Sequence, residues 1–137
     1  MGLDRINIGL TGEVSWNVDR KWCTQRGDYH IFSTPSMVQL AEKAAIEALL
    51  PVLDEGQISV GTRVDIRHLA PTLEGMKVRA VANLIEKEDA RLNFKVEIFD
   101  DLVKVGEAQH ERFVLDLDRY VRRLEKKRAE VKALEQK

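Results

Sequence analysis

The sequence predicts an α+β fold in which an antiparallel sheet of about five strands wraps around a central helix, followed by a C-terminal helix. Three observations predict it. One alternating segment precedes an alanine-rich helical segment, four alternating segments with turn residues follow it, and a charged amphipathic segment ends the chain. The 137 residues are enough for one domain with a sizeable core. We expect residues 1–116 to form this domain and residues 117–137 to form an appended amphipathic helix.

The first strand is predicted within residues 9–19, where apolar and polar side chains alternate loosely. This periodicity is absent from residues 20–32. Gly27 and Asp28 favour a turn there, and Tyr29 and His30 follow them. We therefore expect a loop that can act as a lid, with Tyr29 and His30 either covering a ligand or simply exposed.

The central helix is predicted from Thr34 to about Leu50. Thr34 can cap it by accepting a hydrogen bond from an early backbone N–H, and Pro35 at the first helical position removes no donor that the helix needs. At about 100° of rotation per residue, Glu42 falls outside the polar stripe of this helix. A carboxylate among apolar neighbours is a candidate functional group.

Four segments after the helix have the alternation of strands, and the turns between the last three predict an antiparallel meander. One strand, one helix with a face of small residues, and four antiparallel strands is the order of a hot-dog fold. An open strand edge in such a sheet can pair with a second copy, so we expect a homodimer. The four segments are residues 57–68, 77–87, 91–99 and 103–116.

The predicted C-terminal helix has a narrow apolar stripe among many charged residues. The stripe can pack on the sheet edge or on a partner subunit, and a solvated charged face is the plainer interpretation of the Lys- and Arg-rich part. The stripe consists of Leu117, Val121, Leu124, Val131 and Leu134.

The amino-acid composition limits which binding partners and which cellular compartment we expect. Twenty-two basic and twenty-three acidic residues leave a formal net charge of -1, which provides no field that would attract nucleic acid or an anionic membrane. Cys23 is the single cysteine, so no internal disulfide is possible and it has no metal-ligand spacing. No signal peptide or membrane span is recognisable, and we expect a cytoplasmic protein.

Two stretches of the chain resemble the fluoroacetyl-CoA thioesterase family of hot-dog proteins. In residues 33–75 a Thr is followed eight positions later by a helical Glu, and then by the pattern G-T-x-V-x-x-x-H-x-A at residues 61–70. The second stretch is GEAQHERFVLDLDRY at residues 106–120. The resemblance extends over about residues 9–120, and the combined spacing is far more specific than any one residue.

This resemblance implies that Thr34, Glu42 and His68 are the catalytic residues and that Gly61 lies against the thioester region of the substrate. A thioester needs an attacking oxygen, a group that moves protons, and donors for the developing oxyanion. Glu42 suits either a base acting on water or a direct nucleophile. His68 suits a base, an acid or a donor, and Thr34 can orient water or Glu42 through its hydroxyl.

Each of these residues also has a structural interpretation. Thr34 can be a plain helix cap, and His68 can be a hydrogen-bonded histidine at a strand end. Glu42 can be a charge at the edge of the surface, or it can form a buried pair with Arg63 or Arg67. His110, in the second stretch, suits a structural role equally well, and Cys23 is better explained as a small core residue than as a nucleophile.

The predicted activity is that of an acyl-CoA thioesterase acting on a short or medium acyl chain, with no metal and no cofactor other than the CoA of its substrate. One alternative is a non-catalytic acyl-CoA sensor, although we find no DNA-binding segment in the N-terminal residues. The other is a hot-dog enoyl-CoA hydratase, which also uses His with a carboxylate. The CoA phosphates should meet basic side chains, and those available are Arg63, Arg67, Lys77 and Arg79.

Overall fold

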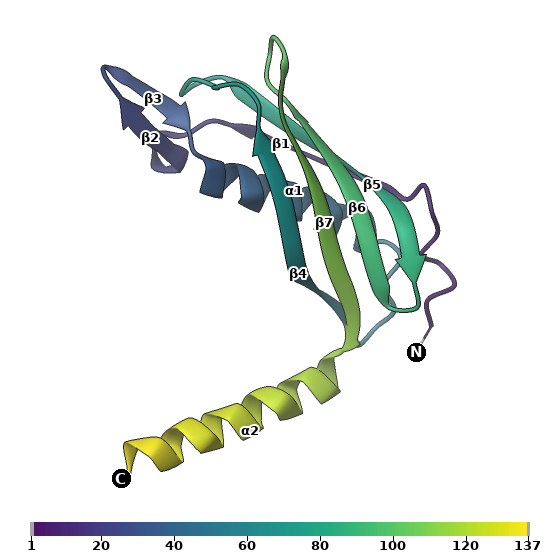
Figure 1. Cartoon of the computed structure of the whole chain (residues 1–137). Coiled ribbons are helices and arrows are strands. Elements are labelled where there is room, and N and C mark those ends of the chain that lie inside the picture. Colours follow the sequence, from purple (N-terminus) through teal and green to yellow (C-terminus); the bar gives the residue numbers. More distant parts are fainter. Residues whose placement is uncertain (1, 137) are drawn as a thin grey trace.

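A computed structural model, which describes residues 2–136, shows a curled antiparallel sheet that wraps around helix α1 (Thr34–Leu49) (Figure 1). The five strands are arranged in the order β1-β5-β6-β7-β4, with every neighbouring pair antiparallel. The predicted hot-dog architecture and the β5-β6-β7 meander are therefore confirmed. The strands are β1 (Thr11–Asn17), β4 (Gln57–His68), β5 (Lys77–Glu88), β6 (Arg91–Phe99) and β7 (Lys104–Asp116).

The core lies between α1 and the concave face of the sheet. Small side chains let the two approach closely, since the alanine face of α1 is fully buried and Gly12 of β1 leaves no room for a Cβ beside the backbone of Ala48. Along β5 and β6 the alternate residues that face α1 are fully buried. Because this packing fixes the position of α1, it also fixes where the side chains at the edges of its buried face lie.

Residues 20–32 are not the loop that we expected. They form a short 3-10 turn, η1 (Arg20–Trp22), and a hairpin of β2 (Cys23–Arg26) and β3 (Tyr29–Phe32). Gly27 supplies the positive φ of 60° that the two-residue turn requires. Contacts to residues outside the hairpin anchor it. The Phe32 ring meets Trp16 edge to face with ring centroids 6.5 Å apart, and the Phe32 backbone N–H donates to the Thr72 carbonyl at 2.8 Å.

Helix α2 (Leu117–Glu135) follows β7 directly and runs away from the sheet (Figure 1). None of its residues is buried. The option that its stripe packs on the sheet edge is therefore wrong for this chain by itself. Among residues 2–136, no helix combines the length and the apolar character needed to cross a membrane.

Candidate active site

The start of α1 is capped by Ser33 and not by Thr34, which corrects our prediction. The Ser33 hydroxyl accepts from the Ser36 backbone N–H at 3.3 Å. Thr34 is thus the first residue inside the helix, and its hydroxyl is not needed for the cap. It lies instead 2.8 Å from Nδ1 of His68, the last residue of β4.

The half-buried His68 has an imidazole suited to proton transfer. Burial lowers its pKa below the ordinary value of 6.5, against a smaller raising contribution from the Ala70 backbone. The ring is therefore mainly neutral at pH 7. When the neutral ring is protonated on Nε2, its Nδ1 accepts a hydrogen bond from the Thr34 hydroxyl. Nε2 itself is buried and has no hydrogen-bond partner within residues 2–136.

A β-bulge in β4 decides which side chains face α1. Gly61 pairs with Arg112 and Arg63 pairs with Glu111, so Thr62 is an additional residue in the ladder. In a regular strand, Gly61 and His68 would face opposite sides, because seven positions is an odd number. The bulge turns both toward the helix.

Gly61 lies in contact range of Glu42. A Cβ at Gly61 would stand 3.1 Å from Glu42 Oε2 and from Arg112 Nη1, and 3.2 Å from His110 Cε1. These distances are too short for a comfortable side-chain contact, so the absence of a side chain at position 61 lets β4 lie close against Glu42, Arg112 and His110.

Glu42, Gly61, Arg112 and His110 form one cluster, and Arg112 lies on its buried side. Its side chain is only 5% exposed, whereas that of Glu42 is 39% exposed, and their charged atoms lie 3.5 Å apart. Arg112 also donates from Nε to Ser59 Oγ at 3.0 Å and from Nη2 to the Ser59 carbonyl at 3.1 Å. Burial lowers the pKa of Arg112, and Glu42 opposes that effect. Glu42 thus pairs with Arg112, and the predicted pairing with Arg63 or Arg67 is wrong.

His110 is the other buried member of the cluster and contacts Arg112. It is fully buried, its Nδ1 lies 2.8 Å from the Arg63 carbonyl, and its Nε2 lies 3.1 Å from Arg112 Nη1. Because a carbonyl can only accept, Nδ1 carries the proton and Nε2 accepts from Arg112. Burial lowers the pKa of His110, and the Arg112 charge lowers it further. A neutral His110 therefore helps to orient Arg112.

The structure brings the predicted residues together as two pairs. Thr34 contacts His68, and Glu42 lies beside Gly61. Glu42 follows Thr34 by eight positions in α1, which corresponds to about 12 Å along the helix axis. Within the described residues no hydrogen bond joins the two pairs.

Sequence reasoning missed Arg112, although a signal for it existed. Along β7 every second residue from Gly106 to Val114 is buried, and Arg112 falls in phase with these. A charge in phase with apolar positions is the same signal that identified Glu42 on α1. It predicts a buried charge with a specific partner.

The other candidates contribute no reactive group. The Cys23 thiol lies 3.4 Å from the Asp19 carbonyl, and burial is the main cause that raises its pKa, so it stays protonated. Tyr29 is 64% exposed, and His30 lies 3.9 Å from Glu74. No group of three or more His, Cys, Asp or Glu residues among residues 2–136 has metal-site geometry.

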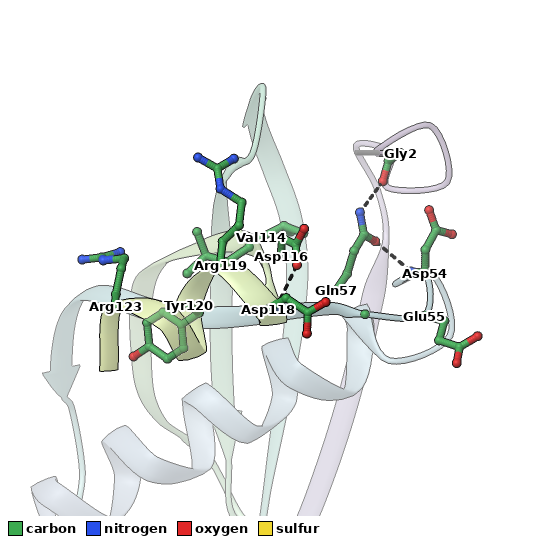
Figure 2. A pocket seen from close by; sticks show the side chains of 12 residues that line it. Gly2, Asp54, Glu55, Gln57, Val114, Asp116, Asp118, Arg119, Tyr120 and Arg123 are labelled. Atoms are coloured by element: carbon green, nitrogen blue, oxygen red, sulfur yellow. Dashed lines mark hydrogen bonds between the residues drawn. The ribbon is translucent and has the colours of Figure 1, made fainter. Parts of the chain in front are cut away.

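A cavity of about 630 Å³ lies away from both pairs, between the α1–β4 turn, the end of β7 and the start of α2 (Figure 2). Acidic side chains outnumber basic ones in its lining, which does not suit the phosphates of a nucleotide. The charge of this lining therefore does not favour CoA. Its charged residues are Asp54, Glu55, Asp116, Asp118, Arg119 and Arg123.

Residues 16–118 match the FlK family of fluoroacetyl-CoA-specific thioesterases. The chain belongs to this family. A fluoroacetyl-CoA thioesterase of Streptantibioticus cattleyicolor is 36% identical over 90 residues, a match that covers 66% of this chain and 65% of that protein. All the residues of the two pairs, together with His110 and Arg112, lie inside the range that matches the family.

Solved structures agree with this assignment. The Thermus thermophilus protein TTHA0967, described as a thioesterase superfamily member, is 26% identical with a TM-score of 0.87, covering 93% of this chain and 97% of that one. A phenylalanine-to-alanine variant of the FlK thioesterase, solved with fluoroacetate and CoA, is 27% identical with a TM-score of 0.77, covering 84% and 99%.

Proposed function

We propose that this protein is an acyl-CoA thioesterase that hydrolyses a short or medium acyl-CoA to the free acid and CoA, without a metal or redox cofactor. Family membership supports the reaction class. The observation that carries the proposal is that the family's motif residues meet in contact pairs, Thr34 with His68 and Glu42 with Gly61. We also propose a cytoplasmic location, which the single cysteine supports.

In the proposed reaction Glu42 works at the thioester carbonyl, either as the base that activates water or as the direct nucleophile. Arg112, fixed by Ser59 and His110, holds the carboxylate in position beside Gly61. The neutral imidazole of His68 exchanges a proton, and the Thr34 hydroxyl orients that ring. Arg63 and Arg67, exposed on the outer face of β4, are available for the CoA phosphates.

We further propose that the working unit is a homodimer joined along β4. This strand forms one edge of the sheet and has twelve residues with an unpaired side. An antiparallel pairing centred near residues 64 and 65 would place Gly61 opposite the partner's His68. Each site would then combine Thr34 and His68 of one protomer with the carboxylate of the other, which the separation of about 12 Å within one chain favours.

The activity is tested by free-thiol release from acyl-CoAs of increasing chain length. Wild type should turn over, and Glu42→Gln should lose at least about 100-fold in turnover, because the amide can neither take a proton nor attack. Glu47→Gln, on the exposed face of the same helix, is the matched control and should keep full activity. Thermal stabilisation by an acyl-CoA without turnover would support the sensor alternative and contradict the proposal.

The shared site is tested by mixing inactive subunits. Glu42→Gln and His68→Asn proteins are unfolded together, refolded and assayed. If each site uses both subunits, a mixed dimer keeps one intact site, and random mixing restores about a quarter of wild-type activity. If each site lies within one chain, mixing restores nothing and the shared-site arrangement is wrong, while the thioesterase proposal stands.

A further inference from the structure

The apolar stripe of α2 is exposed along the whole helix. Leu117 is 42% exposed, Leu124 is 49% exposed and Leu134 is 67% exposed. The helix runs away from the sheet, so no other part of the described chain covers this side (Figure 1). A continuous row of exposed large apolar residues indicates an interaction surface.

The spacing of this stripe is that of a coiled-coil seam. With Leu117 at position a of a heptad, five of the six a and d positions are large apolar or aromatic residues. Such a narrow seam suits another helix better than a sheet, which would need a wider apolar face. The a positions are Leu117, Leu124 and Val131, and the d positions are Tyr120, Lys127 and Leu134.

We propose that α2 pairs antiparallel with α2 of a second copy of this chain, about a two-fold axis between residues 125 and 126. In this register Leu117 packs against Leu134 of the partner subunit, and Tyr120 against Val131 of the partner subunit. Lys127 meets Leu124 of the partner subunit, where its aliphatic stem can pack while the ammonium group reaches water. All six layers are filled, and the two-fold axis makes the interface self-complementary.

The flanking charges decide the orientation. In the antiparallel register the g position Arg123 faces Glu130 of the partner subunit, and the symmetry forms this opposite-charge pair twice. In a parallel pairing Arg123 would face Arg128 of the partner subunit, and Glu130 would face Glu135 of the partner subunit. Two kinds of like-charge contact, together with facing Lys127 side chains, make the parallel arrangement unfavourable.

The shape of the molecule also favours the antiparallel arrangement. Nineteen residues make α2 about 28 Å long. Antiparallel pairing places the two sheet domains at opposite ends of this length, whereas parallel pairing would crowd them at one end. It also sets each helix N-terminus beside the C-terminus of the other, which opposes their dipoles favourably.

This surface is separate from the β4 edge of the proposed active dimer. The two contacts together predict an assembly with two kinds of two-fold axis, which closes as a tetramer when the axes cross at right angles. Loss of the α2 contact halves the mass whether or not the β4 contact forms. The inference therefore does not depend on the proposed function.

A charge exchange at the g positions tests the proposal on the full chain. Arg123→Glu and Glu130→Arg should each create like-charge pairs, halve the mass measured by light scattering and weaken association at least about tenfold. The double variant Arg123→Glu/Glu130→Arg should restore the wild-type mass. Arg122→Glu and Glu125→Arg, outside the seam, make the same charge changes and should leave the mass unchanged.

Two results would overturn the proposal. Stronger association of both single variants would indicate parallel helices, because each reversed charge would then face an opposite charge, on Arg128 or Glu135 of the partner subunit. An unchanged mass in every variant, together with an unchanged mass for Leu124→Lys, would show that α2 does not join copies of this chain. Circular dichroism of each variant confirms that the helix is still folded.

Discussion

The two polar clusters along α1 differ in how firmly the protein holds them. Thr34 is exposed, and one hydrogen bond of 2.8 Å joins it to a half-buried His68. Eight residues later, Glu42 depends on Arg112, whose 5% exposed side chain also has contacts to Ser59 and His110. The first cluster leaves an imidazole free to exchange protons, while the second fixes a carboxylate in one place. The two ends of the site thus hold their candidate reactive groups, an imidazole and a carboxylate, with different firmness.

The largest expected effect concerns the loosely held cluster. His68→Asn should lower turnover by about 100-fold to 10,000-fold, because general acid–base catalysis contributes that much. The thermal unfolding midpoint should change little, since only one side-chain hydrogen bond is lost. Thiol release and differential scanning fluorimetry measure the two quantities. Turnover within about threefold of wild type would assign His68 a structural role only.

In the firmly held cluster around Arg112, the main expected effect of a substitution is on stability. Arg112→Met should lower the free energy of unfolding by about 3 kcal/mol, because it leaves the Ser59 and His110 acceptors unpaired inside the protein. Arg112→Lys should recover less than half of this loss, because an ammonium group cannot reproduce the guanidinium fork. Urea denaturation measures the difference. Arg63→Met, at an exposed position of β4, is the control and should be nearly neutral.

Substitutions of the two neighbouring hydroxyl residues at the start of α1 should affect different quantities, one stability and the other turnover. Ser33→Ala should cost about 1 kcal/mol of stability through the lost cap while turnover stays near wild type. Thr34→Val should leave stability nearly unchanged and lower turnover about tenfold, since the imidazole loses its orienting partner. Thr34→Ser keeps the hydroxyl and should behave as wild type. The reverse pattern would place the cap at Thr34 and refute the assignment.

The smallest effect should be a pH dependence of stability. The folded-state pKa values of His110 and His68 are lowered, so the unfolded chain binds more protons as the pH falls below about 6.5. Their stabilising contribution is complete above that pH and is lost as the pH falls through the folded-state values. The slope is at most about 1.4 kcal/mol per pH unit for each proton. Urea denaturation at a series of pH values on both sides of about 6.5 should show a flatter profile of stability against pH for His110→Gln than for wild type.

Much of the fold was predictable because it depends on local periodicity. The bounds of β4 and β6 agree with the predicted segments, and α1 ends within one residue of the predicted position. The hairpin of β2 and β3 was not predicted, because four-residue strands are too short to show alternation and their contacts to Trp16 and Thr72 are distant in sequence.

For the site, the sequence predicts candidate residues but not their arrangement. It indicates Thr34, Glu42 and His68 as candidates from their combined spacing, and Glu42 also from its place among apolar positions. It does not indicate their contacts. The pairing of Glu42 with Arg112 joins residues 70 positions apart, and it depends on which strand lies beside β4.

The sequence by itself determined the order of the central helix, the five strands of the main sheet and the C-terminal helix, the family, and the candidate residues of the site, because periodicity and motif spacing are properties of neighbouring positions. Only the tertiary structure decided that Ser33 caps α1, that a bulge at Thr62 turns Gly61 and His68 to the same side, and that Arg112 supports Glu42. Strand register and a buried charge network arise from the packing of distant segments, where each contact depends on the desolvation and geometry of its neighbours.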